Sequence, residues 1–83
     1  MQTPLYFDAA PALAFEFIPG ARDVAIQCLA RLEALGSYKF NWSFGERYRL
    51  QSPTWIDAAH MRAMLTRLPP NARSGDIYAR LMG

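Results

Sequence analysis

The sequence feature that most constrains this chain is a run in which aromatic and polar side chains alternate. From residue 38 to residue 44 every second residue is aromatic, and the residues between them are polar. This period of two is typical of a strand with one buried face. After Gly45 the alternation resumes over residues 47–51, with Tyr48 and Leu50 as the apolar members. Two such runs around a glycine predict a β-hairpin.

Side-chain parity predicts the loop of this hairpin. Residues opposite each other in an antiparallel pair project to the same face. A two-residue loop would pair Phe44 with Arg47 and mix the two faces, whereas a loop over residues 45–47 pairs Trp42 with Leu50. We therefore expect a three-residue loop or a bulge near Gly45. By the same parity, residue 41 lies opposite residue 51.

The aromatic face of the hairpin is expected to be the core, because flanking helices need an apolar face to cover. Trp42 should then be largely buried and Arg49 exposed. The opposite face of the sheet is expected to be polar and exposed to solvent. Its members are predicted to be Lys39, Asn41, Arg49 and Gln51.

Amphipathic segments flank the hairpin. Residues 12–18 alternate like a strand, which Pro19 and Gly20 end. Residues 21–35 have apolar side chains at helical spacing, and Gly36 stands where a helix-capping glycine is common. The predicted apolar stripe of this helix is Ala21, Val24, Ala25, Cys28, Leu32 and Leu35, with Ile26 almost opposite.

A second helix is predicted after the hairpin, and Pro69 and Pro70 end it. Its N-terminal cap is either Ser52 or Thr54. Its apolar stripe is predicted to be Ala58, Met61, Met64, Leu65 and Leu68. Residues 76–82 are expected to form a last short helix, because their Ala, Arg, Leu and Met content favours helix over strand.

These elements predict one small α+β domain over residues 1–83, since domains average about 100–150 residues. The expected order is β-α-β-β-α, with a three-stranded, mainly antiparallel sheet, two helices packed on one face and a short C-terminal helix. Placing the third strand between the first two makes every neighbouring pair antiparallel. A strand at residues 77–82 would complete the split β-α-β plan.

Composition and motif spacing argue against several functional classes. The one cysteine, Cys28, excludes an intrachain disulfide and is typical of a reducing compartment. No apolar run approaches the roughly 20 residues that a membrane span needs, and the N-terminal segment carries Asp8 and no basic residue, unlike a signal peptide. We therefore expect a cytoplasmic protein with no membrane partner.

No cofactor and no catalytic activity are expected. The single His and the single Cys have no metal-ligand spacing, and the isolated glycines form no phosphate-binding loop. A nucleophile–base pair of Cys28 and His60 is the sharpest enzyme hypothesis. However, Cys28 lies on the predicted apolar stripe of the first helix, and His60 lies away from the core face of the second.

Protein interaction is the expected function, because two large apolar residues of the second helix, Trp55 and Ile56, fall outside its stripe. Tryptophan and arginine are enriched among binding hot spots. The predicted partner-binding residues are Trp55, Ile56, His60 and Arg67 on the second helix, with Lys39, Arg47 and Arg49 on the hairpin. A small inhibitor or adaptor of a larger machine fits this pattern, for example a phage or mobile-element protein directed against a defence complex. A homodimer also fits.

Nucleic-acid binding is the alternative function. The net charge is +2, and the basic residues gather in the hairpin and from His60 onward. Such a distribution favours an acidic partner or nucleic acid. With the aromatic residues in the core, the polar face of the sheet would contact phosphates rather than stack on bases.

Overall fold

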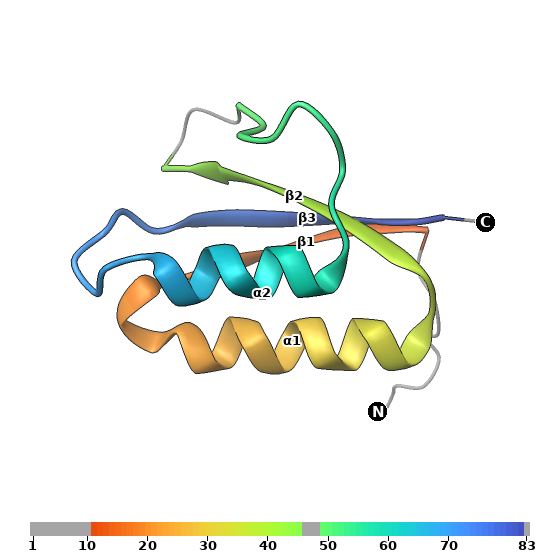
Figure 1. Cartoon of the computed structure of the whole chain (residues 1–83), viewed down its shortest axis with the longest axis horizontal. Coiled ribbons are helices and arrows are strands. Elements are labelled where there is room, and N and C mark those ends of the chain that lie inside the picture. Colours follow the sequence, from red (N-terminus) through yellow and green to blue (C-terminus); the bar gives the residue numbers. More distant parts are fainter. Residues whose placement is uncertain (1–10, 46–48, 83) are drawn as a thin grey trace.

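The computed structural model describes residues 11–45 and 49–82. The elements are β1 (Ala12–Phe17), the 3-10 turn η2 (Pro19–Ala21), α1 (Arg22–Leu35), β2 (Tyr38–Phe44), α2 (Ala58–Arg67) and β3 (Gly75–Leu81). The strands form one antiparallel sheet in the order β1-β3-β2, and both helices cover one of its faces (Figure 1). The predicted α+β class, the three-stranded antiparallel sheet and the two helices on one face are thus confirmed.

The central strand comes from the C-terminal segment, where the sequence predicted a short helix. β3 pairs antiparallel with β1 on one side and with β2 on the other. The predicted helix over residues 76–82 is wrong, because burial outweighs intrinsic helix preference. Ile77 and Ala79 are 0% and 1% exposed, while Asp76, Tyr78 and Arg80 project to the opposite face.

The predicted placement of the residues after Gly45 between the other two strands is wrong. Residues 75–81 supply the central strand, and the residues after Gly45 lie along the outer edge of β2, because β3 occupies the other edge. The observed element order is therefore β1-α1-β2-α2-β3. Because β3 is antiparallel to both neighbours, β1 and β2 run parallel to each other and are joined through α1. This is the split β-α-β arrangement.

After Gly45 the chain turns back along the outer edge of β2, as a hairpin requires. Gly45 has a φ of 57°, which favours glycine. The backbone N–H of Gln51 donates to the Trp42 carbonyl, and Phe40 and Ile56 exchange both of their backbone hydrogen bonds. Residues 49–57, called the return segment below, otherwise form no regular strand.

Asn41 explains why the return segment can leave the strand edge. Its side chain is 1% exposed. Its Oδ1 accepts from the backbone N–H groups of Trp42 and Ser52, and its Nδ2 donates to the Ser52 carbonyl. The amide thus replaces a strand partner between the two points where the return segment pairs with β2. The predicted exposure of Asn41 is wrong, because the return segment covers it.

The expected pairing of residue 41 with residue 51 is replaced by a backbone bond from Gln51 to Trp42. The predicted three-residue loop falls largely on residues 46–48, which lie outside the described residues. The predicted parity of β2 holds in its aromatic positions. Tyr38 and Phe40 are buried, and the half-buried Trp42 packs against the core. Arg49 is exposed as predicted.

The core lies between the sheet and the two helices. Leu13, Phe15 and Phe17 of β1 face it as predicted, and the Phe17 ring meets the edge of Phe44 with centroids 5.9 Å apart. The predicted stripe of α2 is also confirmed, because its members are buried or pack on the core. These members are Ala58, Met61, Met64, Leu65 and Leu68.

The buried stripe of α1 is rotated relative to the prediction, although Ala25 and Leu32 are buried as predicted. Leu29 is 0% exposed and Ile26 packs against the core, whereas Val24 and Leu35 are 59% and 48% exposed. The rotation follows from the position of α1, which packs against α2 as well as against β1. Its apolar face therefore points between these two neighbours.

Side chains cap both ends of α2. Asp57 is the N-terminal cap in place of Ser52 or Thr54, and it accepts the backbone N–H of His60. At the other end, Arg22 of α1 donates from Nη1 to the carbonyls of Leu65 and Thr66, at 2.9 and 2.8 Å. These bonds satisfy carbonyls that a helix end leaves without partners.

Candidate binding site on the open sheet face

The sheet face opposite the helices is the candidate functional site. Its side chains alternate with core residues along each strand, and the strand register aligns them in three cross-strand rungs. The basic rung consists of Ala12, Arg80 and Lys39; the central rung of Ala14, Tyr78 and Asn41; and the acidic rung of Glu16, Asp76 and Ser43. The face therefore has a positive end, an aromatic centre and a negative end.

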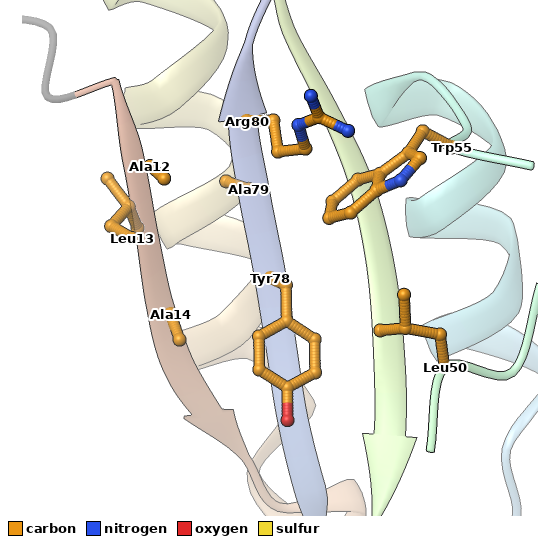
Figure 2. A pocket seen from close by; sticks show the side chains of 8 residues that line it. All are labelled: Ala12, Leu13, Ala14, Leu50, Trp55, Tyr78, Ala79 and Arg80. Carbon is orange, nitrogen blue, oxygen red and sulfur yellow. The ribbon is translucent and has the colours of Figure 1, made fainter. Parts of the chain in front are cut away.

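The return segment builds a wall at the β2 side of this face. Trp55 lies beside Arg80, whose guanidinium carbon is 5.1 Å from the indole centroid, which is a cation–π contact. Leu50 is 45% exposed next to it. Figure 2 shows both side chains over β2, across Tyr78 from Ala12 and Ala14 of β1.

Together these residues enclose a shallow groove of about 510 Å³, called the sheet-face groove below. It is lined by Ala12, Leu13, Ala14, Leu50, Trp55, Tyr78, Ala79 and Arg80. Most of this lining is apolar, and the alanines of β1 make the floor low. The groove can therefore take an apolar surface from a partner.

A hydrogen bond fixes the aromatic centre of the groove. The Tyr78 hydroxyl lies 3.0 Å from the Ser43 hydroxyl, and Ser43 is 0% exposed. This bond directs the tyrosine ring along β3 toward the acidic rung, as Figure 2 shows. The ring therefore offers one side to solvent without losing its polar partner.

The charges of the two outer rungs are available to a ligand. Within the described part of the chain, the ion pairs are Arg62 with Glu33 and His60 with Asp57. None of them includes a residue of the rungs. The pKa of Asp57 is lowered, first by the backbone hydrogen bond from His60 and last by the charge of Lys39. Lys39 therefore has only a weak interaction outside its rung.

The residues predicted from sequence to bind a partner do not form one surface. Trp55 and Lys39 lie on the open sheet face, and exposed Arg49 adjoins Leu50 in the chain. Ile56 pairs with Phe40 and packs against the core.

The other predicted residues lie elsewhere. His60 is in the first turn of α2, bonded to Asp57, whereas Arg67 ends that helix. Arg47 lies outside the described residues.

The sequence did not reveal several residues of this face, among them Ala14, Tyr78 and Arg80. The last two belong to the segment that was predicted as a helix. The alternation of Asp76, Tyr78 and Arg80 with apolar neighbours is the signal that would have placed them on one strand face.

Other kinds of site find little support in the described residues. No three His, Cys, Asp or Glu side chains there lie close enough to hold a metal ion. Cys28 is half-buried on α1, and His60 Nδ1 lies 2.7 Å from Asp57 at an exposed position. Among the helices of the described ranges, none is long and apolar enough to cross a membrane.

Comparisons of the chain with models of known protein families, with curated proteins and with solved structures found no match.

Proposed function

We propose that this protein is a non-enzymatic interaction module that binds a partner protein on its open sheet face. The observation that carries the proposal is the sheet-face groove, in which Trp55 stacks with Arg80 beside the ring of Tyr78. Aromatic and arginine side chains around an apolar centre are typical of binding hot spots. Such a module would act as an inhibitor of a larger protein complex, or as an adaptor that links two complexes.

A protein partner agrees better with the charges of the face than a nucleic acid does. Protein surfaces that bind nucleic acids neutralise the phosphates with several basic side chains. Here Glu16 and Asp76 occupy one end of the same face, where they would repel a continuing phosphate backbone. A protein surface can match a positive end and a negative end together.

The proposal is tested by site-specific photo-crosslinking in a lysate of the source cell. One variant carries p-benzoylphenylalanine at Glu16, an exposed residue of the open sheet face beside the groove, and a control carries it at Val24 on α1, which is 59% exposed. We expect a discrete protein adduct from position 16 that position 24 does not give. Adding Leu50→Glu to the position-16 variant should abolish the adduct, and adding Val24→Glu should not.

The proposal fails if position 16 yields no adduct, or yields the same adducts as position 24. Thermal unfolding of each variant shows whether the fold is retained. Leu50 and Val24 are both exposed by roughly half, so neither change should cost much stability.

Single-stranded nucleic acid is a second candidate ligand, and the cation–π pair of Arg80 with Trp55 next to Tyr78 favours it. Bases stack on exposed aromatic side chains in single-strand binders. Under this alternative the basic hairpin and C-terminal half supply the phosphate contacts. Digestion of the lysate with nuclease before crosslinking distinguishes the two, because an adduct that nuclease removes contains nucleic acid.

A further inference from the structure

We propose that the occupant of the sheet-face groove is one amphipathic helix of the partner, which carries an acidic residue over the basic rung and a basic residue over the acidic rung. This inference rests on the proposed function and names the shape and charge of what is bound. Three observations support it. The sheet face exposes side chains and no backbone hydrogen-bonding groups, the groove floor has the width of a helix, and the two charged rungs are a fixed distance apart.

A sheet face presents side chains, so a segment bound there must satisfy its own backbone hydrogen bonds. A helix does this within itself, whereas an extended segment needs a strand edge. At β2 that edge is already used, because Phe40 bonds to Ile56 and Trp42 to Gln51. For a segment that lies over the sheet face, rather than along the outer edge of β1, a helix is therefore the element that fits.

The groove has the width of one helix. Its floor runs from β1 across β3 to the wall over β2, and two strand spacings amount to about 9.5 Å. A helix with its side chains is about 10–12 Å across. The small side chains of Ala12 and Ala14 let it approach, and Leu50 and Trp55 limit it on the other side.

The charged rungs set the pattern of the helix. Arg80 and Asp76 are four residues apart on β3, which is about 13 Å. At 1.5 Å per residue, an acid and a base seven or eight positions apart span about 10–12 Å and lie on one face of a helix. The side chains cover the remaining distance. Apolar residues between them would face Tyr78.

A second copy of this chain matches the face less well. In a two-fold arrangement, antiparallel sheets would put each basic rung over an acidic rung, but the two Trp55–Leu50 walls would then meet and hold the sheets apart. Parallel sheets would place each wall on the low floor of β1, but Arg80 would then meet Arg80. Neither two-fold arrangement satisfies shape and charge together.

The test uses stapled 18-residue helical peptides labelled with fluorescein, each with a leucine stripe between two charged positions eight residues apart. The mixed peptide carries Glu and Lys, the second carries two Glu, and the third carries two Lys. A fourth peptide has the Lys moved one position further, onto the opposite face of the helix. Binding to the full chain is measured by fluorescence anisotropy.

We expect the mixed peptide to bind roughly 1.5- to 5-fold more tightly than the other three, the effect of one exposed ion pair. Glu16→Lys neutralises the acidic rung and should abolish the preference for the mixed peptide over the double-Glu peptide. Asp23→Lys on α1 makes the same change in net charge away from the groove and should leave the preference intact. Ala14→Arg fills the floor and should weaken every peptide at least about fivefold.

Equal binding of the four peptides, or loss of the preference in Asp23→Lys, overturns the inference. So does an rU12 or dT12 oligonucleotide that binds where no peptide does and is lost in Tyr78→Leu, since the face then serves nucleic acid. A dimer in sedimentation equilibrium that Ala14→Arg dissociates assigns the face to a second copy. If position 16 crosslinks a partner protein and no peptide binds, the proposed function stands and the helical occupant is refuted.

Discussion

Replacing Asn41 by leucine tests the most specific polar arrangement in the structure. The substitution keeps the side-chain size but removes three hydrogen bonds, two accepted by Oδ1 and one donated by Nδ2. Each bond contributes about 0.5–1.5 kcal/mol, and a buried N–H group left without a partner costs about 1–3 kcal/mol. Ser52 is half-buried, so water can replace part of the hydrogen bonding that its backbone loses with Asn41. We expect the free energy of unfolding to fall by about 3 kcal/mol.

In a domain of this size that loss lowers Tm by roughly 12–24 °C, since 1 kcal/mol corresponds to about 4–8 °C. Urea unfolding gives the free energy, and hydrogen exchange locates the effect. The backbone N–H groups of Ser52 and Gln51 should exchange faster than those of the helices. Gln51→Ala, which removes only an exposed side-chain bond, is the control and should change stability by less than about 0.5 kcal/mol. A loss below about 1 kcal/mol for Asn41→Leu, with unchanged exchange at Ser52, would refute the clamping role.

Three further predictions follow from packing, capping and charge. Gly75→Ala should lower the free energy of unfolding, measured in urea, by at least about 1–3 kcal/mol. A Cβ at this position would overlap the Ser43 carbonyl oxygen and come within 3.0 Å of the Phe17 ring. Gly20→Ala is the control and should leave the free energy of unfolding unchanged, because its Cβ meets nothing closer than 3.8 Å. Arg22→Met keeps an apolar stem but removes the donors to the end of α2, and it should lower the free energy of unfolding by about 1–2 kcal/mol. The pKa of Asp57 is lowered from 3.8, chiefly by the backbone hydrogen bond from His60, so its stabilising effect is present above that value and is lost as the pH falls through the lower folded-state pKa. Asp57→Asn retains the cap but does not titrate. In thermal melts at successive pH values, the stability advantage of the wild type over this variant should therefore shrink below about pH 4. An advantage that stays constant down to about pH 2 would contradict a stabilising role for the Asp57 carboxylate.

Elements whose pattern is local could be predicted from the sequence. The pattern of β1 and the aromatic positions of β2 follow from the strand period and one buried face. The apolar stripe of α2 follows in the same way from the helical period. β3 could not be predicted from propensity, because its Ala, Arg and Leu content suits a helix in isolation and becomes a strand only between two partners. The stripe of α1 was misplaced because two neighbours, rather than one sheet, determine which side is buried.

The candidate site was predictable only in part, for related reasons. Trp55 stands out in the sequence as a large side chain that misses the helix stripe. The burial of Asn41 depends on an irregular segment with no period of its own, and no local pattern reveals it. Tyr78 and Arg80 join Trp55 only through the register of β3, so an error in one element removed two of the residues that line the groove.

The central position of β3 also means that the sheet cannot be completed before residues 75–81 have been synthesised. In the native sheet β3 lies between β1 and β2, so neither of these strands has its strand partner until residues 75–81 are in place. These pairings join segments that are distant in sequence, and such contacts form late in folding. The same strand brings Asp76, Tyr78 and Arg80. Completion of the sheet and appearance of the charged, aromatic face therefore both depend on one segment, because β3 supplies the middle residue of every rung.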